Sequence, residues 1–89
     1  MTTACEVVVH GEVQGVFFRE SCRREAEAAG VTGWVSNHAD GTVRAHFEGP
    51  TDAVRRMVGW VHRGPSAAVV ERVDEREAAV DGGSTFEVR

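Results

Sequence analysis

An α+β fold is predicted by three observations. Apolar segments of strand length alternate with two amphipathic helical segments in the order β-α-β-β-α-β, and a short extra strand follows. The dipeptide Asp40-Gly41 joins the second and third strands as a tight hairpin. The chain has 89 residues, which is room for a single domain over residues 1–89. This order is that of the split βαβ, ferredoxin-like sandwich, an antiparallel sheet with two helices on one face.

The first half of the chain predicts a strand, a loop and a helix. Residues 5–10 alternate, with Cys5, Val7 and Val9 on one face of a strand. A glycine-containing loop follows over 11–17. A helix is expected from about 18 to 29, because Phe18, Cys22, Ala26 and Ala29 recur at helical spacing.

The second half predicts a hairpin, a helix and two further strands. The hairpin strands are 33–37 and 42–48, and a helix with Thr51 as its N-cap covers about 52–62. A strand is expected over 68–77, where Val69, Val70 and Val73 do not alternate; a bulge or burial on both faces would explain this. A short strand over 85–88 ends the chain.

Composition limits the partners and the location. The formal net charge is −4, and all ten basic residues are arginine. No basic run is present, which argues against general nucleic-acid binding. No segment is apolar enough to be a signal peptide or a membrane span. Cys5 and Cys22 are predicted to be buried thiols rather than a disulfide, and the expected location is the cytoplasm.

The loop between the first strand and the first helix is the strongest functional feature. It reads Gly11-Glu12-Val13-Gln14-Gly15-Val16-Phe17-Phe18-Arg19. Backbone N–H groups, a helix N-terminus and the Arg19 guanidinium are expected to converge there, and all three favour a phosphate-like dianion. A plain turn at Gly15 is the alternative, although close approach of the backbone to a phosphate explains this glycine equally well.

Several phosphate chemistries do not fit this loop. A Walker A loop needs a Gly-Lys pair, and the chain has no lysine. A cysteine nucleophile six positions before Arg19 is replaced by Val13. No paired Cys or His ligand spacing for a metal is present. Positioning and charge neutralisation remain, and these suffice when the leaving group is already good, as the carboxylate of an acyl phosphate is.

Two segments resemble one enzyme family. The loop sequence 11–19 resembles the phosphate loop of acylphosphatases. Gly33-Trp34-Val35-Ser36-Asn37, followed by Asp40-Gly41-Thr42-Val43, resembles that family's second signature. Glu48-Gly49-Pro50 and Gly64-Pro65 lie where the family would place them, so the resemblance covers nearly the whole chain.

The resemblance implies the fold above, a small acyl phosphate as substrate, and no cofactor or metal. It implies that Arg19 binds the phosphoryl group together with the loop amides, and that Asn37 orients the attacking water; the amides are those of Gln14, Gly15, Val16, Phe17 and Phe18. The residues alone reach Arg19 but not Asn37, since an Asn beside a hairpin ordinarily bonds to its own backbone. Nothing demands more than a monomer.

Three alternatives remain open at this point. One is a non-catalytic anion-binding or regulatory module, which tight phosphate binding without turnover would reveal. Another is an RNA-binding domain of the same fold, which would need exposed aromatic side chains and a basic face. The last is an acylphosphatase-like domain of a larger carbamoyl-transferring protein.

Other side chains have ordinary structural readings. Arg23 and Arg24 are expected on a solvated helix face, and Trp34 and Trp60 are expected to be packing groups. The histidines are expected at the surface or at strand edges; they are His10, His38, His46 and His62.

Two positions depart from the family pattern. Glu12 and Ser36 stand where the family often has a basic residue. Both changes lower the positive charge near the expected anion site, so weaker phosphate affinity and weaker electrostatic steering are predicted than in a more basic relative.

Overall fold

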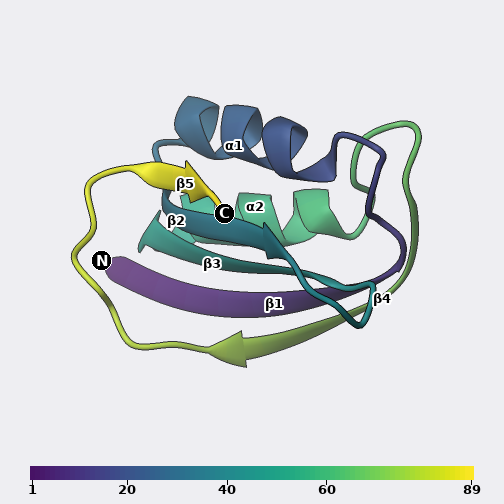
Figure 1. Cartoon of the computed structure of the whole chain (residues 1–89). Coiled ribbons are helices and arrows are strands. Elements are labelled where there is room, and N and C mark those ends of the chain that lie inside the picture. Colours follow the sequence, from purple (N-terminus) through teal and green to yellow (C-terminus); the bar gives the residue numbers. More distant parts are fainter.

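The computed structural model describes all 89 residues and has five strands and two helices (Figure 1). The elements are β1 (Thr2–Glu12), α1 (Phe18–Ala29), β2 (Thr32–Asn37), β3 (Val43–Pro50), α2 (Thr51–Val61), β4 (Val69–Glu77) and β5 (Phe86–Val88). The strands form one sheet in the order β4-β1-β3-β2-β5. The predicted α+β, ferredoxin-like arrangement is confirmed, and the bounds predicted for the first helix agree with α1.

Both helices lie on the same face of the sheet (Figure 1), and the core fills the space between them and the strands. Alternation places Val7 and Val9 of β1 and Ala45 and Phe47 of β3 on this inner face, where all four are buried. Phe18 at the start of α1 packs on the ring of Trp60, with ring centroids 5.3 Å apart. This contact fixes the first turn of α1, which carries Arg19, against α2.

Two details at the ends of elements differ from expectation. The last strand, β5, pairs with β2 in parallel, so the sheet is mixed rather than purely antiparallel. The N-cap of α2 is Pro50, and no side chain caps this helix. Thr51 is the first helical residue instead, and its hydroxyl oxygen lies 2.6 Å from that of Thr3. The Thr51 side chain thus contacts a strand far away in the sequence and does not cap the helix.

The irregular apolar pattern of β4 has a local cause. The β1–β4 register pairs His10 with Arg72 but Gly11 with Val70, which leaves Glu71 as an extra residue in β4. This is the bulge that the pattern of valines allowed. It lies where β1 leads into the loop that precedes α1.

The face of the sheet away from the helices holds a buried polar cluster, and the expectation for His46 was wrong. Only 4% of His46 is exposed, and its two ring nitrogens lie 3.1 Å and 3.0 Å from carboxylate oxygens of Glu6 and Glu48. Glu48 also accepts the backbone N–H groups of Asp81 and Gly82. The segment after β4 therefore covers this face, which the alternation of β3 alone cannot reveal.

The two cysteines are free thiols, as predicted, but only one of them is buried as expected. Cys22 is fully buried in the core, and burial raises the pKa of its thiol. Cys5 is half-buried on β1, where desolvation raises the pKa of its thiol as well.

Neither helix is long and apolar enough to cross a lipid bilayer.

Candidate functional site

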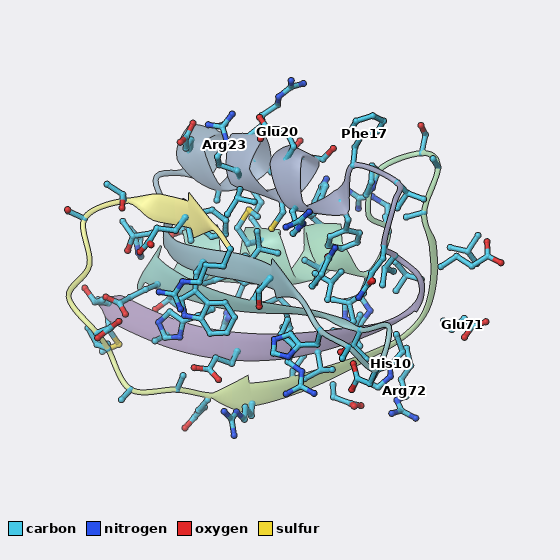
Figure 2. All side chains as sticks on the ribbon, in the orientation of Figure 1. His10, Phe17, Glu20, Arg23, Glu71 and Arg72 are labelled. Atoms are coloured by element: carbon cyan, nitrogen blue, oxygen red, sulfur yellow. The ribbon has the colours of Figure 1, made fainter.

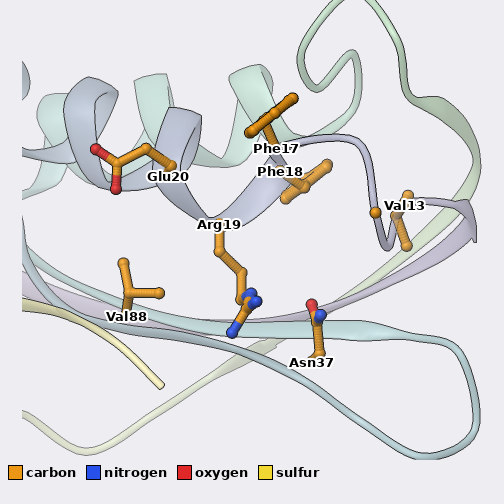
Figure 3. Close-up of a pocket in the computed structure, with 8 residues that line it drawn as sticks. Val13, Phe17, Phe18, Arg19, Glu20, Asn37 and Val88 are labelled. Atoms are coloured by element: carbon orange, nitrogen blue, oxygen red, sulfur yellow. The ribbon is translucent and has the colours of Figure 1, made fainter.

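A pocket of about 310 Å³ opens where the start of α1 faces the ends of β2 and β5 (Figure 3). Loop backbone, one guanidinium and one carboxamide share this space. The lining residues are Val13, Gly15, Phe17, Phe18, Arg19, Glu20, Asn37 and Val88. The pocket thus gathers both segments that the sequence singled out, although Arg19 and Asn37 lie 18 positions apart in the sequence.

The backbone of the loop turns through two left-handed residues. Gly15 has φ 74°, and Phe17, the N-cap of α1, has φ 61° and ψ 27°. Phe17 is the one residue of the chain other than glycine with a positive φ. Such a conformation costs a residue with a Cβ roughly 1–2 kcal/mol and is concentrated at functional sites. The chain therefore keeps a strained backbone at this loop.

The loop amides have no partner within the chain. None of the twelve backbone hydrogen bonds outside helices and strands is donated by residues 14–19. The N–H groups at the start of α1 are free because a helix leaves its first donors unpaired. Alternating left-handed residues and a helix N-terminus together form a concave set of donors, which suits an anion.

Neighbouring phenylalanines have opposite roles in holding the loop. The Phe18 ring is buried in the core, whereas 82% of Phe17 is exposed. Figure 2 shows Phe17 projecting outward from the start of α1. The Phe18 ring therefore anchors the loop to the hydrophobic core, whereas the Phe17 ring does not.

Arg19 projects from the first turn of α1 toward the sheet, and its guanidinium lies beside Asn37 in the view of Figure 3. Its Nη1 donates a hydrogen bond of 2.9 Å to the backbone oxygen of Arg89, just beyond β5. A guanidinium has five N–H donors, so four remain. The contact orients Arg19 without consuming its capacity for two oxygens of one anion.

Glu20 is the one acidic side chain that lines the pocket, and two arginines neutralise it. Arg23 binds its carboxylate directly, and Arg24 Nε lies 3.5 Å away. The hydrogen bonds from Arg23 lower the pKa of Glu20, with Arg24 adding to the effect. Arg23 also pairs with Glu27 at 2.7 Å. Figure 2 shows Arg23 on the outer side of α1, and Arg24 is exposed, so these arginines serve the helix surface, as predicted.

Asn37 is the last residue of β2, and the turn after it is held by a closed set of hydrogen bonds. The His38 N–H donates to the Thr42 carbonyl at 2.9 Å, and the Gly41 N–H to the His38 carbonyl at 3.0 Å. Asp40 accepts both the backbone N–H and the hydroxyl of Thr42, which lowers the pKa of its carboxyl to about 2. The position of Asn37 is therefore set by a turn that bonds to itself.

The sequence-predicted site residues divide into two groups. Gly15, Phe17, Phe18, Arg19 and Asn37 line the pocket. Two others, Gln14 and Val16, do not line it. Val16 packs at the edge of the core, and the Gln14 side chain bonds to the turn after β2. For these two residues the predicted role as phosphate ligands rests on their backbone N–H groups alone.

Sequence reasoning missed two features of the site. Val88 reaches the pocket because β5 pairs in parallel beside β2, and no local pattern signals that pairing. The left-handed conformation of Phe17 was also unforeseen, because glycine, Asn and Asp are the residues that normally signal positive φ. The glycine two positions earlier was the only hint of an unusual backbone there.

Comparison with known proteins gives one consistent result. The family model Acylphosphatase matches residues 5–88. An acylphosphatase from a Nocardioides species is 51% identical over the whole chain and is covered over 90% of its own length. The acylphosphatase structure from Coxiella burnetii superimposes with a TM-score of 0.95 at 42% identity, over 99% of this chain and 93% of that one. The Bacillus subtilis acylphosphatase gives 0.94 at 32% identity, over 100% and 99%.

These matches cover the phosphate loop, the Asn37 segment and the fold together. They confirm the predicted enzyme activity, the hydrolysis of acyl phosphates, and they disfavour the non-catalytic module. On the strength of a family model over nearly the whole sequence and relatives at about half identity, the chain belongs to the acylphosphatase family.

Proposed function

We propose that the loop amides and Arg19 hold the phosphoryl group of an acyl phosphate while Asn37 orients the attacking water. One observation carries this proposal: the pocket is lined by Arg19, by Asn37 and by three loop residues whose amides have no partner in the chain, namely Gly15, Phe17 and Phe18. The amides and the guanidinium meet the negative oxygens. The carboxamide oxygen and nitrogen can each hydrogen-bond a water molecule.

The reaction needs no protein nucleophile. The water oxygen forms a bond to phosphorus as the bond from phosphorus to the carboxylate oxygen breaks, and the electron pair leaves with the carboxylate. The hydrogens of the water remain with the inorganic phosphate produced. In a loose transition state the water requires orientation more than deprotonation, which suits a carboxamide better than a strong base.

The size of the pocket supports a small substrate. About 310 Å³ open to solvent accommodates a phosphoryl group and a short acyl chain. Val88 and Phe18 are apolar residues of the lining, and Arg19 is its one cationic residue. We infer that the enzyme recognises the phosphoryl group first and places few demands on the acyl part.

An isotope experiment tests this mechanism. Acetyl phosphate is hydrolysed in water enriched in oxygen-18, with and without a chelator, and the label is located by mass spectrometry. Attack at phosphorus predicts that the enzyme-dependent label appears in inorganic phosphate, at a rate that the chelator does not change. Label in acetate, or loss of the rate with chelator, would contradict the mechanism.

We also infer that the protein acts as a monomer in the cytoplasm. Two free thiols, one of them fully buried, fit a reducing compartment. Each site residue comes from the same chain, so the pocket is complete in one copy. Light scattering coupled to gel filtration should give the mass of one chain, 9.6 kDa; twice that mass would contradict the monomer.

A further inference from the structure

The Gln14 side chain joins the two halves of the site. Its Nε2 lies 2.7 Å from the His38 carbonyl oxygen and 3.0 Å from the Thr42 carbonyl oxygen. Both neighbours are acceptors, so the amide nitrogen must face them, and its two hydrogens serve two bonds. One residue of the phosphate loop is thereby fixed to both ends of the turn that follows Asn37.

The two carbonyl groups are also held by hydrogen bonds within the turn, independently of Gln14. The Thr42 carbonyl also accepts the His38 N–H, and the His38 carbonyl also accepts the Gly41 N–H. Thr42 itself is buried and bonded to Asp40. The Gln14 side chain therefore bonds to a rigid turn rather than to a loose segment. The position of Gln14 is tied to the position of that turn.

The loop has few other bonds that would set its distance from the turn. Its own amides have no partner in the chain, and its anchors, Val13 and Phe18, are apolar. Apolar contacts are not directional, so small displacements of the loop cost little free energy. A pair of hydrogen bonds with defined lengths and angles restricts them.

We propose that Gln14 is a positioning residue for hydrolysis, which sets the distance between the phosphoryl group held by the loop and the water held by Asn37. Its side chain does not touch the substrate. This inference rests on the roles proposed above for the loop and for Asn37, and it adds the element that aligns them. A misplacement of reacting groups by about 1 Å can reduce a rate on the order of 10²-fold.

The test is a double-mutant cycle with acetyl phosphate as substrate and inorganic phosphate as competitive inhibitor. Gln14→Met keeps the length of the side chain but removes both donors. We expect kcat to fall about 10- to 100-fold. The inhibition constant of phosphate should change little, because the loop amides and Arg19 are intact. The same substitution on the Asn37→Ala background should cause almost no further loss, since the water is already unplaced.

Ser36→Ala is the matched control. The Ser36 hydroxyl lies 3.0 Å from His38 Nε2, so this change removes a hydrogen bond at the same turn without touching the Gln14 bonds. It should leave kcat unchanged. If Gln14→Met does not fold, Gln14→Asn takes its place, because its shorter side chain keeps the amide but cannot reach both carbonyls.

The outcomes separate the possible failures. An unchanged kcat in folded Gln14→Met would overturn the positioning role, as would an independent loss on the Asn37→Ala background. A rise in the inhibition constant as large as the fall in kcat would also overturn it, because Gln14 would then act on the anion cradle. If Asn37→Ala alone keeps full kcat, the proposed role of Asn37 fails instead, whatever the Gln14 variants show.

Discussion

The phosphate loop and the turn after β2 form the two halves of the candidate site, and they differ in how their backbone groups are hydrogen-bonded. The loop over 14–18 leaves its backbone donors unpaired and contains the strained residue Phe17. In the turn over 38–42, backbone and side-chain groups bond to one another. Unpaired donors give an anion something to bind, and a self-bonded turn keeps Asn37 in one place. If the proposed roles hold, the loop half supplies affinity for the phosphoryl group and the turn half aligns the water.

The largest expected effect comes from Arg19 in the loop half. Arg19→Ala should lower kcat/KM about 10³-fold, which corresponds to roughly 4 kcal/mol of transition-state stabilisation. Arg19→Lys should recover only part of the loss, because an ammonium lacks the planar fork. Steady-state kinetics on acetyl phosphate checks both variants, with circular dichroism to confirm folding. Near-normal activity in folded Arg19→Ala would remove Arg19 from the mechanism.

Substitution of Asn37 should affect kcat rather than the binding of phosphate. Asn37→Ala should lower kcat on the order of 10²-fold and leave the inhibition constant of phosphate almost unchanged. The residue is exposed at the end of β2, so stability should be preserved. Equal losses in kcat and in phosphate affinity would mean that phosphate binding and water alignment are not divided between the two halves.

A pair of glycine substitutions compares the halves directly. Gly15 in the loop has φ 74° and Gly41 in the turn has φ 89°, and an added Cβ would meet nothing within 4 Å at either position. Each alanine should therefore cost about 1–2 kcal/mol of unfolding free energy from backbone strain alone. Only Gly15→Ala should raise the inhibition constant of phosphate, because it shifts the loop amides. Denaturant titration and inhibition assays measure the two effects.

A smaller effect is expected at Glu12. This residue is exposed, ends β1 and does not line the pocket. Glu12→Arg should lower KM for acetyl phosphate severalfold at low salt, and the gain should fade as salt screens the added charge. A KM that stays constant or rises at low ionic strength would show that this charge does not reach the anion site.

The smallest effect concerns pH and the turn. The pKa of Asp40 is about 2 in the folded chain, below its ordinary value of 3.8, chiefly through the hydrogen bonds from Thr42. A lowered pKa adds stability that is fully present above pH 3.8 and is lost as pH falls toward 2. Thermal unfolding of Asp40→Asn and the parent chain should therefore differ most above about pH 4 and converge at lower pH. A constant difference over this range would contradict the assignment.

The local features of the fold could be predicted from the sequence. Helical spacing around Cys22 and Ala26 located α1, and the Asp40-Gly41 turn located the hairpin, because both signals lie within a few residues of one another. Arg19 followed from the same local logic. Asn37 needed the family resemblance, since its neighbours alone indicate an ordinary turn residue.

The features that could not be predicted from the sequence depend on contacts between residues far apart along the chain. The burial of His46 depends on Glu6 and on the segment after β4, which lie about 40 and 35 residues away in the sequence. The bonds of Gln14 to His38 and Thr42 likewise exist only once the sheet has formed. The parallel pairing of β5, which brings Val88 to the pocket, is set by the path of the chain around the sheet edge.

A crystal structure with inorganic phosphate bound tests the central claim most directly. We expect the anion in the pocket between α1 and β2, with its oxygens accepting N–H groups from the loop over 14–18 and two donors of Arg19. Asn37 should lie on the side where a water can approach phosphorus. A phosphate bound elsewhere, or one that leaves the loop amides unpaired, would contradict the division of the site into a binding half and an aligning half.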